Sequence, residues 1–252
     1  MRGSGGLEDI SLVVTTLNEE YNIGRCLGSA AGAGEIILVD SGSTDRTVEI
    51  AGEYGAKVYT RDFVSNSDQK NWAIAKSTLP WVLVLDADES LTDGLREEIA
   101  AAVRSGRMDG YWIYRRNEFL GSPIRHCGWD RDRVLRLFRR GKGRYPERAV
   151  HERLELDGSA GVLVSRMEHR PYRDLSDYID RMKGYSRRGA VELSRSGRRW
   201  FPGIVTRPTA RFLRMYFLQL GVLDGAAGLL LCGAAAAGVF FKYAWLREMS
   251  SQ

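Results

Sequence analysis

The chain has 252 residues, of which 44% are hydrophobic and 27% charged, so it can bury a sizeable core but is too polar for a conventional multi-spanning membrane protein. The net charge of +5 suits an anionic partner without naming its class. The three cysteines are far apart and lack the spacing of a zinc site, so we expect free thiols in a reducing compartment.

The first ninety residues alternate between predicted strands and helices. Apolar runs rich in β-branched residues predict buried strands over residues 10–16, 35–40, 56–60 and 81–85. Apolar residues at helical spacing predict the helices between them, with Asn18 as the expected N-cap of the first. This order predicts an open parallel sheet covered on both faces, with a ligand crevice at the carboxyl ends of its strands.

The second half of the chain contains fewer regular patterns. Thr92 begins an expected helix, and three apolar runs predict strands over residues 110–115, 133–138 and 162–169. A polar helix is expected from residue 175 to about residue 195. The composition changes beyond it, so we expect an α/β domain over residues 7–199 and a helical segment over residues 200–252.

Asp86-Ala87-Asp88 follows the fourth predicted strand directly and is the strongest chemical signal in the chain. The charge of a pyrophosphate leaving group has to be neutralised, and a divalent ion held by carboxylates does this as a Lewis acid. Mg²⁺ or Mn²⁺ fits oxygen ligands of this kind. The alternative is a solvated turn that only caps the next helix.

Two more polar segments follow predicted strands. Asp40 ends the second strand, where its carboxylate can accept from a base N–H or a ribose hydroxyl, whereas Ser43 and Asp45 suit helix capping better. Residues 16–20 follow the first strand, and their two carboxylates suit hydroxyl or base contacts better than phosphate. Because Asp40 and Asp86 both end strands, the fold should bring them to one edge of the sheet.

Residues 16–20, 40–45, 69–71 and 86–89, taken in order, resemble the inverting family 2 glycosyltransferases, and in particular their branch of lipopolysaccharide-core β-glucosyltransferases. The resemblance covers residues 10–185 and implies a GT-A fold with a mostly parallel central sheet. It is specific in the first half, where four motifs occur in order at predicted strand ends. In the second half it depends on Trp129 and on residues 136–138 and 150–152.

The resemblance implies a role for each matched residue near the sugar donor. Asp40 would contact the uracil of a UDP-sugar. Thr16 and Glu19 would lie along its nucleoside, and Lys70 would sit near its nucleotide. Asp86 would approach the ribose or the metal ion.

The metal and acceptor side matches the family pattern less completely. The resemblance implies that Asp88 holds the metal. His169, at a predicted strand end, is a candidate to complete the ligand shell of that metal, and the alternative is a strand histidine that only hydrogen-bonds within the protein. Many relatives carry a Glu-Asp pair as the catalytic base, which the second half lacks. Glu152, with His151 as neighbour or substitute, is our candidate base, and an edge strand with outward polar residues is the alternative. Arg136 is the candidate for binding an anionic acceptor.

These features favour a metal-dependent, inverting transfer of a sugar, expected to be glucose, from a UDP-sugar to a cell-envelope glycan such as lipopolysaccharide core or a lipid-linked saccharide. A sugar nucleotidyltransferase is an alternative, but it would need a Gly-rich loop with Arg or Lys where residues 15–20 stand. A membrane-tethered scaffold without activity is another, and it need not bind a UDP-sugar with metal. Residues 31–34 do not indicate a dehydrogenase, because their glycines precede a strand. No nucleic-acid partner is expected.

Residues 207–247 predict a segment that associates with a membrane. Three arginines at residues 207–214 stand beside bulky apolar residues, as in interfacial helices. Residues 225–241 are apolar but shorter than the about 20 residues that span a bilayer. Basic residues on both sides of this run favour a hairpin-like, monotopic association with the cytoplasmic face of the inner membrane. The alternatives are a buried helical hairpin or a homo-oligomer interface.

Overall fold

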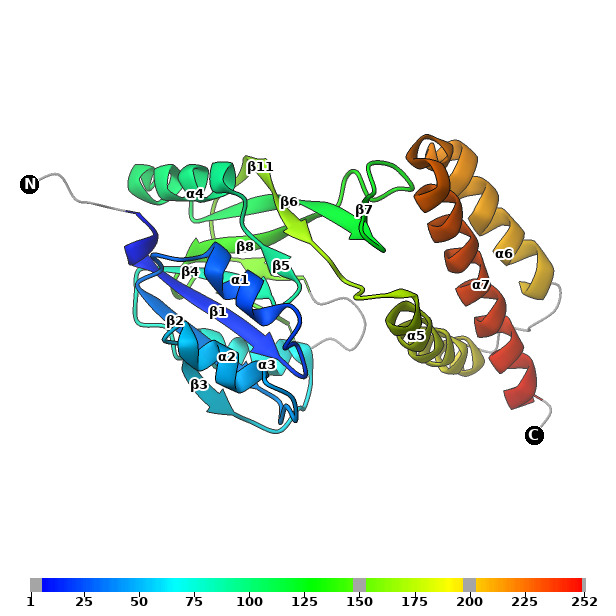
Figure 1. Ribbon diagram of the computed structural model, residues 1–252, viewed down its shortest axis with the longest axis horizontal. Helices are drawn as coiled ribbons and strands as arrows, with labels where there is room; N and C mark the ends of the chain where they lie inside the picture. The colour runs from blue at the N-terminus through cyan, green and yellow to red at the C-terminus, as the bar shows by residue number, and fades with distance from the viewer. Residues whose placement is uncertain (1–5, 147–152, 197–202, 251–252) are drawn as a thin grey trace, which may run out of the picture. The chain divides into compact units, whose positions relative to one another are not determined.

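The computed structural model describes residues 6–146, 153–196 and 203–250, and the chain forms two compact units (Figure 1). Unit 1 comprises Met1–Arg115 and Asp132–His169, and unit 2 comprises Arg116–Arg131 and Arg170–Gln252. Helix α5 (Leu175–Arg195) therefore belongs to unit 2 by its contacts, whereas the sequence-based division groups it with the α/β domain. The functional division between residues 199 and 200 stays a prediction.

A nine-stranded sheet forms the centre of unit 1, in the order β3-β2-β1-β4-β8-β6-β11-β5, with β7 paired to β6. Strands β3, β2, β1 and β4 pair in parallel, and β8 then joins β4 and β6 antiparallel. The bounds are β1 Ile10–Thr16, β2 Glu35–Asp40, β3 Lys57–Thr60, β4 Trp81–Asp86, β5 Glu89–Ser90, β6 Gly110–Phe119, β7 Ser122–Pro123, β8 Arg133–Arg139 and β11 Ala160–His169. A separate ribbon pairs β9 (Gly143–Arg144) with β10 (Glu155–Leu156).

Helices cover both faces of this sheet because its central strands are apolar on both faces. Leu12 and Val14 of β1 pack in the core cluster that includes α1 (Ile23–Ser29), α2 (Thr47–Glu53) and α4 (Asp93–Ser105). Val13, between them, packs in the opposite cluster with α3 (Asn66–Ile74). A short 3₁₀ turn, η1 (Leu7–Asp9), precedes β1.

The α/β fold class predicted from the sequence is confirmed, and the structure adds an antiparallel half to the parallel strands. Thr92 caps α4 as expected, since its hydroxyl accepts from the Leu95 amide. The prediction that Asn18 caps the first helix is wrong. Asn18 has a left-handed backbone (φ 54°), and α1 begins only at Ile23. The Asn18 side chain accepts from the Thr44 amide instead, so it bridges two loops.

Glu35 is a buried acid that anchors the amino end of β2 to its neighbours. Its Oε1 accepts from the Ser11 hydroxyl at 2.6 Å and from the Thr78 amide at 2.6 Å, and Lys57 Nζ lies 3.4 Å from Oε2. Burial alone would raise the pKa of this carboxyl, but these donors outweigh it and lower the pKa to about 2. The ionised form is therefore stabilised by folding.

We expect Glu35→Gln to make the free energy of unfolding depend less on pH below about pH 4.5. A carboxyl whose folded pKa is depressed stabilises the fold above its unfolded pKa of about 4.5 and loses this contribution as the pH falls towards about 2. The variant should lose on the order of 2 kcal/mol of unfolding free energy at pH 7 and less at pH 3. Urea denaturation at several pH values measures this. Glu97→Gln, at an exposed position in α4, is the matched control and should keep the wild-type dependence on pH.

Unit 2 is helical apart from β7 and the end of β6. Helix α5 and helix α6 (Gly203–Leu213) both contact the long helix α7 (Gly225–Ser250). A π-helical segment (Arg214–Leu218) and a 3₁₀ turn (Gly221–Asp224) connect α6 to α7, so the two form a helical hairpin (Figure 1). All three cysteines of the chain are buried free thiols, as expected.

Candidate functional site

The carboxyl ends of β1, β2 and β4 lie side by side and carry the residues that the sequence singled out. Thr16 pairs with Asp40 across β1 and β2, and Thr15 pairs with Asp86 across β1 and β4. The parallel register therefore brings Asp40 and Asp86 to one edge of the sheet, each beside the end of β1. This placement is the one predicted from their positions at strand ends.

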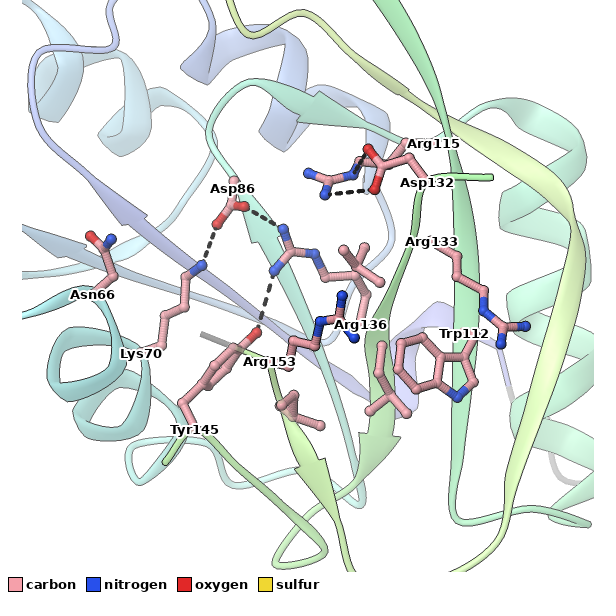
Figure 2. Close-up of a pocket in the computed structure, with 13 residues that line it drawn as sticks. Asn66, Lys70, Asp86, Trp112, Arg115, Asp132, Arg133, Arg136, Tyr145 and Arg153 are labelled. Carbon is pink, nitrogen blue, oxygen red and sulfur yellow. Dashed lines mark hydrogen bonds and ion pairs between the residues drawn. The ribbon is translucent and has the colours of Figure 1, made fainter. Parts of the chain in front are cut away.

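Asp86 joins two buried cations from different elements (Figure 2). Lys70 Nζ of α3 lies 2.7 Å from Asp86 Oδ1, and Arg136 of β8 pairs with Oδ2. Arg136 also lies 2.7 Å from Glu89 Oε1, and the Glu89 side chain is fully buried. Tyr145 accepts from Arg136 at 3.3 Å and places its ring 5.3 Å from Lys70 Nζ. The four charged groups form one continuous network.

Asp86, Lys70 and Arg136 hold one another ionised. Burial opposes the charge on Asp86, yet Arg136 and Lys70 keep the pKa of its carboxyl well below the usual range. Burial likewise opposes the charge on Lys70, but Asp86 raises the pKa of its ammonium. Asp86 and then Glu89 raise the pKa of Arg136 against the same opposing effect of burial. The edge of the sheet therefore carries fixed charges across the physiological pH range.

We expect Arg136→Met to destabilise the fold by about 3–5 kcal/mol, because it leaves the buried carboxylates of Asp86 and Glu89 without their shared cation. Urea denaturation measures the loss, which is large against a typical total of about 5–15 kcal/mol. The control is Arg140→Met, one residue beyond the same strand at an exposed position, which should stay within about 0.5 kcal/mol of wild type. Equal effects of the two changes would contradict a structural role for the network.

Asp40 closes the turn that follows β2. The residue is 2% exposed, and its carboxylate accepts from the Gly42 amide at 2.9 Å and the Ser43 amide at 2.8 Å. Gly42 has φ 92°, which favours glycine. Thr16 lies beside Asp40, and its hydroxyl is buried without a hydrogen-bond partner among the described residues. The uracil contact predicted for Asp40 stays a prediction.

The loops after β1 and β2 brace each other. The Asn18 amide donates to Ser43 Oγ at 2.8 Å, and the Thr44 amide donates to Asn18 Oδ1 at 2.8 Å. The Glu19 amide donates to Thr47 Oγ1 at 2.8 Å. These contacts join the two loops to each other. The helix-capping role expected for Ser43 is wrong, because α2 begins at Thr47 with Arg46 as its N-cap residue and no side-chain cap. The nucleoside contact predicted for Glu19 stays a prediction.

Asp88 lies in the turn between β4 and β5 and is held from two sides. Arg25 donates to the Asp88 carbonyl oxygen at 3.0 Å and to the Ser90 hydroxyl at 2.6 Å. His169 Nε2 lies 3.6 Å from Asp88 Oδ2, so β11 brings together two residues that the sequence assigned to the metal. Asp88 Oδ1 is buried and has no hydrogen-bond partner in the described part of the chain. Such an oxygen fits a cation ligand.

The residues present fit a divalent ion only if the substrate supplies some of its ligands. Within residues 6–146, 153–196 and 203–250, no group of three or more His, Cys, Asp and Glu side chains is placed to hold a metal. Both oxygens of Asp86 face cations, so Asp88 is the more direct candidate ligand. A Mg²⁺ site commonly uses one or two carboxylates and completes its shell with substrate phosphates. Asp88 and His169 fit that pattern.

A pocket of about 380 Å³ opens beside Asp86 in unit 1 (Figure 2). Its lining residues come from α3, β4, β6, β8 and the segments that flank residues 147–152: Asn66, Lys70, Asp86, Trp112, Arg115, Asp132, Arg133, Val134, Leu135, Arg136, Tyr145, Arg153 and Leu154. Arg133 lies 5.3 Å from the centroid of the Trp112 ring. Neither Arg133 nor Arg153 forms an ion pair with a described residue. The pocket is thus rich in cations and suits an anionic ligand.

Sequence reasoning found Lys70, Asp86 and Arg136 of this pocket but missed Arg115, Asp132 and Tyr145. Arg115 Nη1 lies 3.3 Å from Glu89 Oε1, and Arg115 Nε lies 2.9 Å from Asp132 Oδ2. For Arg115 the available signal was a basic residue at the end of the predicted strand over 110–115, and Asp132 and Tyr145 carried no comparable signal. The candidate bases His151 and Glu152 lie outside the described residues.

The profile of glycosyl transferase family 2 matches residues 11–190 of the chain. The lipopolysaccharide core biosynthesis glycosyltransferase LpsC of Rhizobium meliloti is 31% identical over 254 residues, covering 93% of this chain and 93% of LpsC. An uncharacterized glycosyltransferase of Rickettsia typhi is 26% identical and covers 97% of this chain and 88% of its own.

Solved structures of glycosyltransferases also align with the chain. Residues 1–349 of S. aureus TarS, in complex with UDP-GlcNAc, align at 15% identity and a TM-score of 0.48, covering 96% of this chain and 91% of that one. The glucosyl-3-phosphoglycerate synthase of Mycobacterium tuberculosis, in complex with Mn²⁺, UDP and glucosyl-3-phosphoglycerate, aligns at 23% identity and a TM-score of 0.36, covering 43% of this chain and 44% of that one.

The family profile spans most of the chain, and the similarity to LpsC extends over nearly the full length of both proteins. Of the motifs that carry the sequence resemblance, residues 69–71 and 86–89 supply Lys70 and Asp86 to the cationic pocket and Asp88 to the pair with His169. The chain belongs to glycosyl transferase family 2.

Proposed function

We propose that the chain transfers a sugar, with inversion, from a UDP-sugar to a cell-envelope glycan, with UDP-glucose as the donor and lipopolysaccharide core or a lipid-linked saccharide as the acceptor. The pocket beside Asp86 is the observation that carries the proposal. It lies at the carboxyl edge of the parallel strands and presents Arg133 and Arg153 without acid partners among the described residues. A nucleoside diphosphate brings the negative charge that such a pocket accommodates.

Some residues of the pocket would bind the UDP-sugar, and others hold those binding residues in place. Lys70 and Arg136, held by Asp86, present fixed positive charge to the pocket without needing to rearrange. Glu89 fixes Arg136 from behind, and Tyr145 packs beside both cations. Charges oriented before the substrate arrives stabilise a developing pyrophosphate more effectively than water does, because no reorientation is required.

Asp88 and His169 would hold the divalent ion, Mg²⁺ or Mn²⁺, that we propose as the cofactor. The buried oxygen of Asp88 without a partner among the described residues supports this assignment, and so does the position of His169 at 3.6 Å. When bound, such an ion supplies Lewis-acid stabilisation of the leaving diphosphate. Glu152, with His151 beside it in the sequence, is the proposed general base that takes the proton of the acceptor hydroxyl.

A screen of UDP-sugars tests the proposed function. Purified full-length protein is incubated with each UDP-sugar, with Mg²⁺, Mn²⁺ or excess chelator, and with or without a lipopolysaccharide-core or lipid-linked acceptor. We expect UDP release that depends on metal and rises with the acceptor, largest for UDP-glucose. Binding of UDP-sugar without any turnover would favour a scaffold. Formation of a nucleotide sugar from a nucleoside triphosphate and a sugar phosphate would favour a nucleotidyltransferase.

We also propose that the helical hairpin attaches the enzyme to the cytoplasmic face of the inner membrane, with residues 200–252 as the attaching segment. One helical segment of the described residues, Gly221–Ser250, is long and apolar enough to cross a membrane, with a mean hydropathy of 1.8 and 17% of its most apolar window buried. Large exposed apolar side chains gather where α6 turns into α7: Phe217, Leu218, Leu220, Val222, Leu223, Leu229 and Leu230. An exposed cluster of this kind is typical of a membrane or protein contact.

Two glutamates introduced at the turn of the hairpin test this attachment. Leu218 is 80% exposed and Leu223 is 64% exposed, so Leu218→Glu with Leu223→Glu should release the protein from membranes without unfolding it. Leu175→Glu, at a 51% exposed position on α5, is the control and should stay membrane-bound. A reporter fused after Gln252 should remain cytoplasmic. Its detection across the membrane would mean a spanning helix, and a soluble wild-type oligomer would mean that the cluster is a subunit interface.

A further inference from the structure

A second cavity, of about 420 Å³, lies within unit 2 and has no part in the site described above. Its walls come from α5, α6, the π-helical segment, α7 and two aromatic residues that precede α5: Trp129, Tyr172, Tyr178, Met182, Tyr185, Ser186, Arg211, Met215, Leu231, Ala235, Gly238, Val239 and Lys242. The volume falls within the about 300–1,000 Å³ usual for ligand pockets.

The walls of this cavity are mainly aromatic and aliphatic, apart from the two cations Arg211 and Lys242. Burial raises the pKa of Tyr172 to about 12 and also raises that of Tyr178, so both phenols stay protonated. Their rings meet edge to face at 4.8 Å. Small residues on α7 line part of the space, since Ala235 presents only a methyl group and Gly238 has no side chain. The Gly238 carbonyl accepts from the Ser186 hydroxyl at 2.9 Å.

Of the two cations that line this cavity, Arg211 has no counter-charge among the described residues. Arg211 is exposed, lines the cavity and forms no ion pair with a described residue. Its charge acts on the buried Tyr178 hydroxyl, which places the guanidinium near the aromatic wall. Along α7 the lining residues run from Leu231 to Lys242, about 16 Å at 1.5 Å per residue. The cavity is therefore elongated, with apolar walls and a guanidinium that suits a phosphate.

We propose that this cavity binds one hydrocarbon chain of a phosphate-bearing lipid, with the chain along α7 and the phosphate on Arg211. The hydrocarbon chain packs against the aromatic and aliphatic walls of the cavity. The phosphate supplies the counter-charge that Arg211 lacks among the described residues. Membrane phospholipids and prenyl-phosphate lipids share this chemistry. The inference requires neither sugar transfer nor the membrane attachment proposed above.

Native mass spectrometry of the full chain, released from a neutral maltoside detergent, counts bound molecules directly. Decyl phosphate is the probe, and decanol and inorganic phosphate supply its chain and its charge separately. We expect one decyl phosphate per chain, bound at least about tenfold more tightly than either partial probe. Lysophosphatidylglycerol and geranylgeranyl phosphate then identify the source, because the true class should bind more tightly. Failure of decyl phosphate to exceed decanol would overturn the proposal.

Two variants locate the bound probe. Ala235→Leu fills the cavity and should weaken decyl phosphate and decanol alike by about tenfold. Arg211→Gln, at an exposed position that should not disturb folding, should weaken decyl phosphate about tenfold and leave decanol unchanged. Arg207→Gln, on the same helix but outside the cavity, is the matched control and should bind as wild type does. Equal loss from Arg207→Gln and Arg211→Gln would mean nonspecific attraction to a basic helix and would sink the idea.

Discussion

Asp88→Asn is expected to abolish sugar transfer while leaving the protein folded. The substitution keeps the size of the side chain but removes the charge of a partly buried carboxylate whose buried Oδ1 has no partner among the described residues. If that oxygen binds the divalent ion, transfer should fall by about 10³-fold, equivalent to about 4 kcal/mol of lost charge stabilisation. Steady-state kinetics with saturating metal measures the effect.

Donor binding separates this explanation from simple damage to the site. In calorimetric titrations the wild-type protein should bind a UDP-sugar more tightly with Mn²⁺ or Mg²⁺ than with chelator, and Asp88→Asn should lose that difference. Its melting temperature should stay close to wild type, because the side chain lies in a turn. Asp93→Asn, at a fully exposed position in the first turn of α4, is the matched control and should transfer normally. Full activity of Asp88→Asn, or of the wild type in excess chelator, would disprove a metal-dependent reaction.

The sequence predicts the parallel half of this fold well because its signals are local. Residues 81–86 form a continuous apolar run that ends on an acid, and such a run has to become a buried strand with its acid at the sheet edge. The capping hydroxyl of Thr92 is equally local, three residues from the amide that it accepts. Asn18 failed as a predicted cap because a contact with Thr44, 26 residues away, decides its conformation.

The interior of the site was less predictable because its geometry depends on contacts between residues that lie far apart in the sequence. Arg136 contacts Asp86 and Glu89, which precede it by 50 and 47 residues. No periodicity in the chain encodes such contacts. Asp40 lies at the sheet edge as expected, but its carboxylate also accepts from two amides of its own turn, and its contact with the uracil stays a prediction. Position at a strand end thus predicts where a residue lies but not which partner it binds.

The lining of the first pocket adds indirect support for the proposed base. Arg153 and Leu154 line the pocket, and they directly follow His151 and Glu152, which lie outside the described residues. An inverting transfer requires one group to accept the proton of the acceptor hydroxyl as it attacks the anomeric carbon. Glu152 has the right chemistry for this step, since a carboxylate accepts a proton and can be tested by an isosteric amide.

Glu152→Gln is therefore expected to lower turnover by about 10²–10⁴-fold, the usual contribution of a positioned general base, with UDP-sugar affinity unchanged. Turnover is measured with a glycan acceptor and affinity by calorimetry, so that loss of chemistry is distinguished from loss of binding. Glu155→Gln, in strand β10 where Arg144 pairs with it, is the matched control and should turn over normally. Near-normal turnover of Glu152→Gln together with an inactive His151→Ala would move the role to His151. If both variants transfer normally, the proton acceptor lies elsewhere in the chain or on the acceptor itself, because the same attack on the anomeric carbon still has to release a proton.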